Sequence, residues 1–159
     1  MKDFAEEDFT ISPELLKINE RQIAILDQEN TDGEGWDYYC NGQVVRATMY
    51  KNRIVGTVRE LLETFDVEIK VEQDEIITSC SCGTKAGVCK HTVAFLYSWV
   101  NDRSDFLNVG SSIKKLYKME KSELIDIIGR VIQNDPTNVR FFFNNALDED
   151  ELDIEGLIE

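Results

Sequence analysis

The chain has 159 residues, 42% of them apolar, and its 31 acidic and 17 basic side chains give a formal net charge of −14. This length suits one domain with at most an appendage, and the apolar fraction excludes wholesale disorder. No apolar run approaches the roughly 18 to 20 residues that cross a bilayer. The acidic N-terminus also lacks the apolar stretch of a secretory signal. We therefore expect a cytoplasmic protein with no membrane partner.

Charge is distributed unevenly along the chain. Residues 1–37 and residues 119–159 each carry 11 acidic and 3 basic side chains, whereas residues 77–118 carry 2 acidic and 6 basic ones. The whole molecule should therefore be repelled by bulk nucleic acid, while the interior segment has the sign that a phosphate backbone attracts. Acidic ends that only keep the protein soluble would give the same distribution.

The N-terminal part has the signals of a helix. Ser12 can cap a helix and Pro13 fits its first turn. Apolar residues at helical spacing then predict a helix over 13–29, which a glycine-containing loop at 31–35 ends. Residues 1–35 are thus expected to form an acidic helical segment.

Residues 36–79 have the pattern of antiparallel strands. Apolar alternation from Trp36 to Cys40 predicts a first strand, and the clearest strand is 66–72, where apolar and charged side chains occupy opposite faces. Turns are predicted at Asn41-Gly42, Lys51-Asn52 and Gln73-Asp74. Residues 59–65, between two strands, are expected to form a single helical turn. The segment as a whole predicts a meander of three or four strands.

From residue 91 the apolar periodicity becomes helical. Residues 93–100 are apolar almost all round, which predicts a buried helix. Two amphipathic helices are expected at 113–117 and 122–132, within a C-terminal helical cap of residues 105–146.

The last segment, residues 147–159, alternates seven acidic residues with apolar ones. This composition predicts a disordered tail. Its apolar residues could dock as a short motif on a basic partner, or the tail could serve solubility alone. The side chains of Phe141–Phe143 could pack into the core of the protein or contact another subunit.

The most informative segment has the pattern C-x-C-x6-C-x-H. It places three cysteines and the only histidine of the chain within twelve residues: Cys80, Cys82, Cys89 and His91. Thiolate and imidazole are the ligands that Zn²⁺ prefers, four in a tetrahedron. Cysteines two apart on a strand point to one face. The second pair converges only if a helix begins around residues 89–91.

Other interpretations of the cluster are disulfides, an iron–sulfur cluster, and a catalytic dyad of Cys89 and His91. Disulfides would leave one thiol over and need an oxidising compartment. A closed site of four ligands is structural, since it leaves no position for water or substrate, and we favour one structural zinc ion. Lys85 and Lys90 flank the site and offset its negative charge. The remaining cysteine, Cys40, is expected to be a small buried hydrophobe.

This motif, preceded by strands and followed by an apolar helix, resembles the SWIM zinc finger family. Ser81 between the first two cysteines and Lys90 before the histidine match the family's typical pattern. The resemblance is strongest over 76–100 and extends over 36–136. It implies a strand-strand-helix zinc module, here within residues 36–104, that binds DNA or protein partners.

We expect an α+β fold in which an antiparallel meander is followed by a zinc-tied helix and flanked by an N-terminal helix and C-terminal helices. No phosphate-binding loop and no second Cys/His cluster is present, so we expect no enzyme activity and no small-molecule substrate. The preferred function is an interaction adapter for a protein partner. The alternative is DNA binding through a basic face that consists of Lys85, Lys90, Lys114, Lys115 and Lys118.

Overall fold

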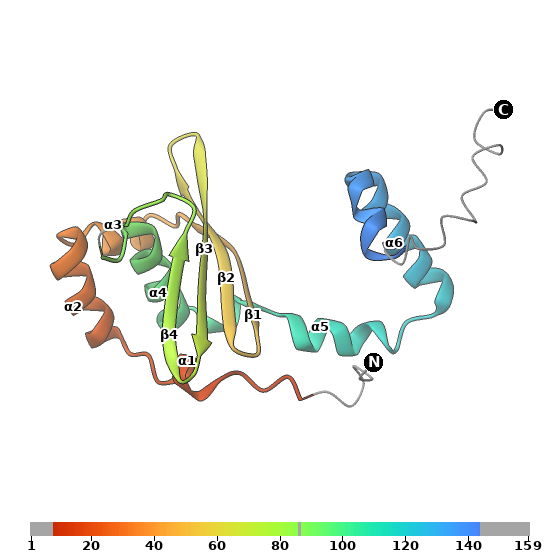
Figure 1. The fold of residues 1–159 in the computed structure, drawn as a ribbon, viewed down its shortest axis with the longest axis horizontal. Helices are drawn as coiled ribbons and strands as arrows, with labels where there is room; N and C mark the ends of the chain where they lie inside the picture. The colour runs from red at the N-terminus through yellow and green to blue at the C-terminus, as the bar shows by residue number, and fades with distance from the viewer. Residues whose placement is uncertain (1–7, 86, 144–159) are drawn as a thin grey trace. The chain divides into compact units, whose positions relative to one another are not determined.

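The computed structural model describes residues 8–85 and 87–143. It is a mixed α+β fold with a five-stranded sheet and several helices, which confirms the expected class (Figure 1). One compact unit ends at Lys115 and a second begins at Leu116. The predicted tail at 147–159 lies outside the described residues.

The N-terminal helix is not continuous, so the prediction of one helix over 13–29 is wrong. Helix α1 spans Pro13–Leu16 and helix α2 spans Glu20–Thr31. Asn19 starts α2 with a reciprocal cap, because its side chain accepts the Gln22 N–H at 3.0 Å and its own N–H donates to the Gln22 side chain at 3.2 Å. Such a capping box favours a new helix start over continuation of α1.

Helix α3, Glu34–Cys40, occupies the place where apolar alternation predicts a strand. The prediction is wrong because the buried Asp27 carboxylate accepts the backbone N–H groups of Gly35 at 2.9 Å and Trp36 at 3.0 Å. These bonds satisfy the N-terminal donors of a helix. The Trp36 ring also packs edge-on against Tyr97, with centroids 5.0 Å apart.

The predicted meander is confirmed as four antiparallel strands in one sheet. The strands are β1 (Val44–Tyr50), β2 (Arg53–Glu60), β3 (Glu63–Glu72) and β4 (Glu75–Cys80), and the two-residue β5 (Leu107–Asn108) pairs parallel with β1. The order is β4-β3-β2-β1-β5, so β4 forms one edge. The three predicted two-residue turns lie where the sequence places them.

The helical turn predicted at 59–65 is wrong, because these residues form the β2–β3 hairpin. Glu60 pairs with Glu63, and Leu61 and Leu62 make the two-residue turn. Leu61 has φ +56°, a left-handed conformation that this kind of hairpin turn requires and that leucine rarely adopts. Both leucines are fully exposed. The turn fixes the position of Glu60 at the end of β2.

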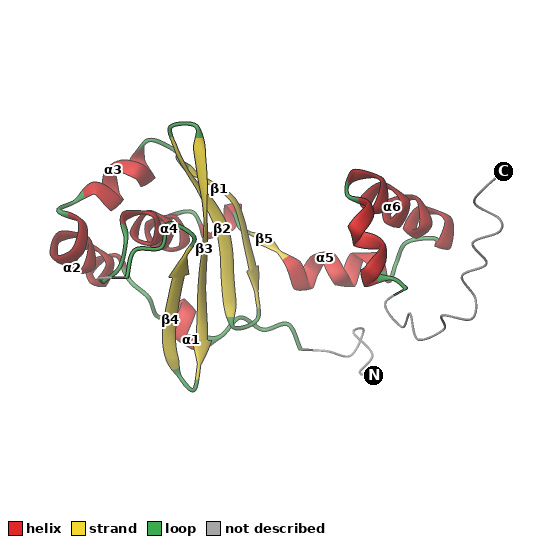
Figure 2. Ribbon diagram, turned by 45° about the horizontal axis from the view of Figure 1, so that its top comes forward, coloured by secondary structure: helices red, strands yellow, loops and turns green. Residues whose placement is uncertain are grey.

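Helix α4, Lys90–Asn101, is the predicted buried helix and is confirmed. It lies between the sheet and the pair α2 and α3 (Figure 2). Gly56 of β2 allows this close packing, since a Cβ there would lie 2.4 Å from the Phe95 ring. The Trp99 indole N–H donates to the Leu15 carbonyl at 2.8 Å, which ties α1 to the core.

The C-terminal helices are also confirmed. After the 3-10 turn η1 (Arg103–Asp105) come α5 (Val109–Leu116), α6 (Lys121–Asn134) and the 3-10 turn η2 (Pro136–Phe141). None of the described residues from 116 to 143 is buried, and the Phe141 side chain is 82% exposed. Within the described part of the chain, no helix combines the length and apolarity needed to cross a membrane.

Candidate metal centre

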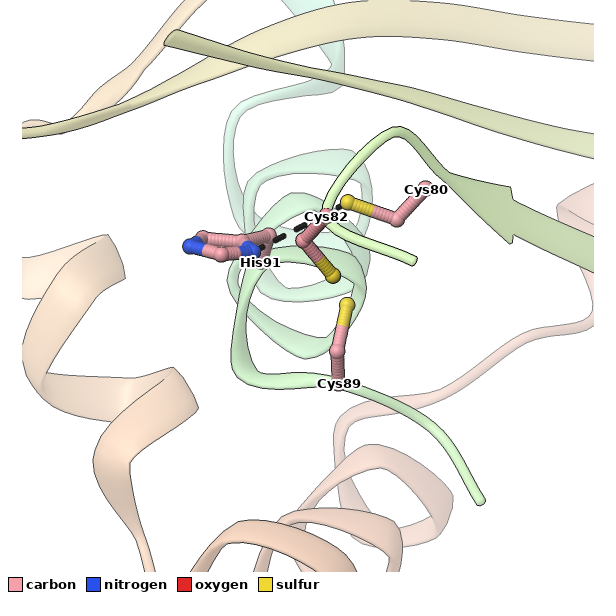
Figure 3. Close-up of side chains that lie close together, drawn as sticks. All are labelled: Cys80, Cys82, Cys89 and His91. Carbon is pink, nitrogen blue, oxygen red and sulfur yellow. Dashed lines mark hydrogen bonds between the residues drawn. The ribbon is translucent and has the colours of Figure 1, made fainter. Parts of the chain in front are cut away.

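The structure brings the three cysteines and the histidine of the sequence motif together (Figure 3). Their ligand atoms all lie within 4.8 Å of one another. Cys80 ends β4, Cys82 lies in the turn after it, Cys89 caps α4 and His91 lies in the first turn of that helix. The site therefore joins the edge strand to the buried helix.

The turn after β4 is held by hydrogen bonds that aim two sulfur atoms at the site. The Ser81 hydroxyl accepts the Asp66 N–H at 2.8 Å, and the Ser81 N–H donates to the Asp66 carbonyl at 2.9 Å. Gly83, with φ +73°, closes the turn by donating its N–H to the Cys80 carbonyl at 3.3 Å. Cys80 and Cys82 thus approach one point from a single short turn.

The return from the loop to α4 depends on Asn30 of α2. Its side-chain oxygen accepts the Val88 N–H at 3.2 Å, and a Cβ at Gly87 would lie 2.3 Å from the same oxygen. Cys89 then caps α4, with its sulfur accepting the Thr92 N–H at 3.4 Å. This confirms the expectation that a helix begins between the third and fourth residues of the motif.

The His91 ring is held in one orientation. Its Nε2 lies 2.7 Å from the Glu60 carboxylate, while its Nδ1 faces the Cys80 sulfur at 3.8 Å. The side chain is only 4% exposed, and the Phe65 ring stacks on it at 4.3 Å. With the proton on Nε2 bonded to the carboxylate, the lone pair of Nδ1 points into the group of sulfur atoms.

Glu60 is the residue that sequence reasoning missed. Its carboxylate accepts the Lys90 ammonium at 2.8 Å and the Tyr38 hydroxyl at 2.7 Å, in addition to the histidine. The hydrogen bond from Lys90 has the largest effect on Glu60, followed by those from Tyr38 and His91, and together they lower the pKa of Glu60 to about 2. The same contact with Glu60 raises the pKa of Lys90. The carboxylate is therefore ionised and able to orient the ring. Glu60 lies 31 residues before His91, next to a turn of two leucines, and nothing in the local sequence indicates that the two residues are in contact.

The thiols of the site differ in acidity. Burial raises the pKa of Cys80 to about 12. Burial also acts to raise the pKa of Cys82, but hydrogen bonds from Thr84, with further ones from His91 and Cys80, outweigh it and lower that pKa to about 6. A divalent cation among these sulfurs would stabilise the thiolates and displace their protons.

The group fits a four-coordinate metal ion. Ligand atoms about 2.0–2.3 Å from a tetrahedral ion lie roughly 3.5–3.8 Å from one another. The Cys80–His91 separation of 3.8 Å agrees with this, and the 4.8 Å limit for the whole group requires only small side-chain shifts. Three thiols with one imidazole are also the donor types that borderline-soft metals bind.

The five lysines of the expected basic face lie at different places. Lys85 is exposed in the loop between the ligands, and Lys90 is occupied by its ion pairs with Glu60 and, at 3.4 Å, Glu34. Lys114 and Lys115 are in the last turn of α5, and Lys118 belongs to the second unit. Lys114 lies over the Phe9 ring at 5.6 Å, near the β1–β2 turn, at the opposite end of β2 from the metal group.

Cys40 takes no part in the metal group. It ends α3 and is exposed, so the expectation of a buried small hydrophobe is wrong. Its exposure follows from the replacement of the predicted strand by a helix, whose last turn faces solvent at this position.

Comparison with known proteins identifies no relative. No family model, no curated protein and no solved structure matches this chain. What the site does therefore has to be inferred from its own residues and their geometry.

Proposed function

We propose that Cys80, Cys82, Cys89 and His91 hold one structural zinc ion in a SWIM-type finger, and that the protein is a non-enzymatic adapter for a protein partner. The observation that carries this proposal is the convergence of the four ligand atoms within 4.8 Å. The Glu60 bond to the far nitrogen of the histidine supports it, because metal-binding histidines donate their other N–H to such a partner.

Zinc is the metal that best suits three thiolates and an imidazole. Four protein ligands complete its coordination, so no position is left for water or substrate, and the ion serves the fold rather than a reaction. The zinc would fasten the end of β4 to the start of α4. The adjacent ammonium of Lys90 lies beside a site whose net charge with three thiolates would be −1.

The SWIM-type assignment is supported by the order of elements around the ligands. β3 and β4 form a hairpin, the first cysteine pair follows it, and the second pair opens α4. The two further motif residues have structural roles: Ser81 ties the ligand turn to Asp66 of β3, and Lys90 binds the Glu60 carboxylate that orients His91.

The adapter role is supported by the surface of the protein. A net charge of −14 steers the protein away from polyanions and toward basic partners. The first unit also exposes large apolar side chains in its sheet, at the hairpin tip of Leu61 and Leu62 and on β4 at Ile76 and Ile77. Such side chains are available to a partner, but they are spread over two ends of the sheet, so the acidic charge is the stronger support for this role.

DNA binding is the second candidate, and one cluster favours it. Near the β1–β2 turn, Lys51 lies 5.4 Å from the ring centroids of both Phe9 and Tyr50, and Arg53 lies 5.9 Å from that of Tyr50. The Lys114 ammonium lies 5.6 Å from the centroid of the Phe9 ring. Cations interleaved with aromatic rings are the side chains that bind single-stranded nucleic acid.

The two candidates are separated by capture of partners on the tagged full-length protein, with and without nuclease treatment. We expect a protein that stays bound after nuclease treatment, is lost with His91→Ala and is retained with Cys40→Ser, which removes a cysteine outside the site. Capture that nuclease abolishes, together with DNA binding that Lys51→Glu/Lys114→Glu removes, would favour the second candidate. Capture that His91→Ala leaves unchanged would contradict a role for the finger.

A further inference from the structure

The three cysteines of the metal group differ in their surroundings. Cys80 packs against the hydrophobic core of the first unit. Cys82 and Cys89 instead line a surface pocket of about 320 Å³, together with Thr84 and His91, and Cys80 is not among the residues that line it. Two of the thiols therefore face a space that solvent can enter, whereas the third belongs to the interior.

The two thiols at the pocket lie in surroundings that favour reaction at sulfur. Residues 83–85, which follow Cys82, are exposed, and the Cys82 sulfur lies 3.2 Å from the Thr84 hydroxyl. The Cys89 sulfur lies 3.3 Å from the Thr92 hydroxyl, at the N-terminus of α4. A hydroxyl donor and a helix N-terminus both stabilise a thiolate, which is the form that reacts with oxidants.

The same two thiols are close enough to form a bond with each other. Figure 3 shows the Cys82 and Cys89 side chains pointing toward each other, and their sulfur atoms lie within 4.8 Å. The sulfur atoms of a disulfide are about 2.05 Å apart, so the pair has to approach by less than about 3 Å. The intervening loop has room for this shift at Gly83, where a Cβ would meet no atom within 4 Å.

We propose that the metal centre is a redox switch, in which a peroxide oxidises Cys82 and Cys89 to a disulfide and the zinc ion is released. Only Cys80 and His91 would remain as ligands, which is too few for a closed site of four. The disulfide would still join the turn after β4 to the start of α4, so the first unit should stay folded. This proposal rests on the zinc site proposed above and adds its regulation.

The chemistry balances with hydrogen peroxide as the oxidant. The Cys82 thiolate attacks one peroxide oxygen, so an S–O bond forms, the O–O bond breaks and hydroxide leaves. The Cys89 thiolate then attacks the resulting sulfenic sulfur, so the S–S bond forms and a second hydroxide leaves. Two protons convert the hydroxides to water. The two sulfurs are oxidised and the peroxide is reduced, and because the oxidant reacts at sulfur it needs no open position on the ion.

The test treats the full-length protein, shown by native mass spectrometry to carry one zinc ion, with hydrogen peroxide and a chromophoric zinc chelator. We expect one zinc ion to be released per chain and the chain to lose the mass of two hydrogen atoms. After alkylation of free thiols, trypsin cuts at Lys85 and separates Cys89 from Cys80 and Cys82. Fragmentation of the linked peptides should place the bond between Cys82 and Cys89, with Cys40 and Cys80 alkylated. Reduction with a dithiol in the presence of zinc should restore the starting mass.

The matched variants are Cys80→Ser and Cys82→Ser, which make the same change at the two cysteines of the first pair. Both are prepared without metal and oxidised in the same way. Cys80→Ser keeps both thiols of the pocket and should still form the disulfide, whereas Cys82→Ser should lose it. Cys40→Ser, outside the site, should release zinc as the wild-type protein does. Circular dichroism controls for folding, and the mapping in the wild-type chain decides the outcome if a variant does not fold.

The proposal is overturned if zinc stays bound at peroxide concentrations that oxidise free cysteine, or if the disulfide contains Cys80 or joins two chains through Cys40. Zinc release through sulfinic acids, with no disulfide, would also overturn it. In each of these results the protein carries zinc before oxidation, so the zinc site stands and only the switch fails. A chain that purifies without zinc would overturn the zinc site and the switch together.

Discussion

His91 is able to present Nδ1 to three sulfur atoms because Glu60 holds its other ring nitrogen. The carboxylate is itself fixed by the Lys90 ammonium and the Tyr38 hydroxyl, so protein contacts alone set the orientation of the ring. At the scale of single residues, the site therefore consists of five side chains: three thiols and the imidazole around one point, and the carboxylate that holds the imidazole.

The substitution Glu60→Gln tests this orientation. The amide keeps one accepting oxygen where the carboxylate has two, and it loses the charge that attracts both His91 and Lys90. We expect zinc affinity to fall by about 10- to 100-fold, the usual effect of changing a residue that supports a metal-binding histidine. Competition with a chromophoric zinc chelator at constant pH measures the affinity.

Glu63→Gln is the control for this experiment, because Glu63 lies across the same hairpin turn and its side chain is exposed. It should leave zinc affinity unchanged. Equal affinity of the wild-type protein and Glu60→Gln would contradict the role of the carboxylate.

The convergence of the three cysteines and the histidine could be predicted from the sequence, because they lie within twelve residues and their types suit one metal ion. Glu60 could not, because its contact with His91 depends on the register of the β2–β3 hairpin. That register is set by a turn of two leucines, which carry no turn signal. The sequence motif is enough to recognise the cysteine and histidine cluster, whereas the contact of Glu60 with His91 depends on the tertiary structure.

At the scale of elements, α3 depends on a single buried carboxylate. Asp27 is 2% exposed and accepts hydrogen bonds from the N–H groups of Gly35 and Trp36 and from the Tyr97 hydroxyl, the last at 3.3 Å. It therefore joins α2, α3 and α4 at one point. The same bonds explain why the apolar alternation in this segment does not produce a strand.

We expect Asp27→Ala to lower the free energy of unfolding by about 3 kcal/mol, because several charge-assisted bonds are lost and buried donors are left unpaired. Urea denaturation followed by circular dichroism measures the change. Glu29→Ala removes an exposed carboxylate from the same helix and should shift the free energy by less than about 0.5 kcal/mol. Equal effects of the two substitutions would show that Asp27 does not hold these elements together.

Strands and helices with long, regular patterns were predicted correctly, as the alternation of β3 and the all-round apolar character of α4 show. Short segments were not. The break between α1 and α2 is set by the Asn19 cap, and the turn at Leu61 needs a left-handed leucine. At Asn19 a local cap outweighs the average preference of the segment, whereas at Leu61 the pairing of β2 with β3 on either side imposes the turn.

At the scale of the whole molecule, the hydrophobic core belongs to the first unit. The core cluster runs from Leu15 to Phe106, and none of the described residues from 116 to 143 is buried. The four residues of the proposed metal site also all precede residue 92. The core cluster and the four residues of the proposed metal site therefore all lie within the first unit.

A chain that ends at Lys115 tests this organisation. We expect it to bind one zinc ion and to unfold cooperatively at the same urea concentration as the full-length protein, because its core and its ligands are unchanged. Sedimentation velocity should show it as a single well-behaved species. A truncated chain that aggregates or loses its metal would place part of the fold's stability beyond residue 115.

The most direct test of the central claim is native mass spectrometry of the full-length protein purified without added metal. We predict the mass of the chain plus one zinc ion, retained in Cys40→Ser and lost in Cys82→Ser. The wild-type chain at its metal-free mass, folded and with four free thiols, would contradict both the zinc site and the SWIM-type assignment.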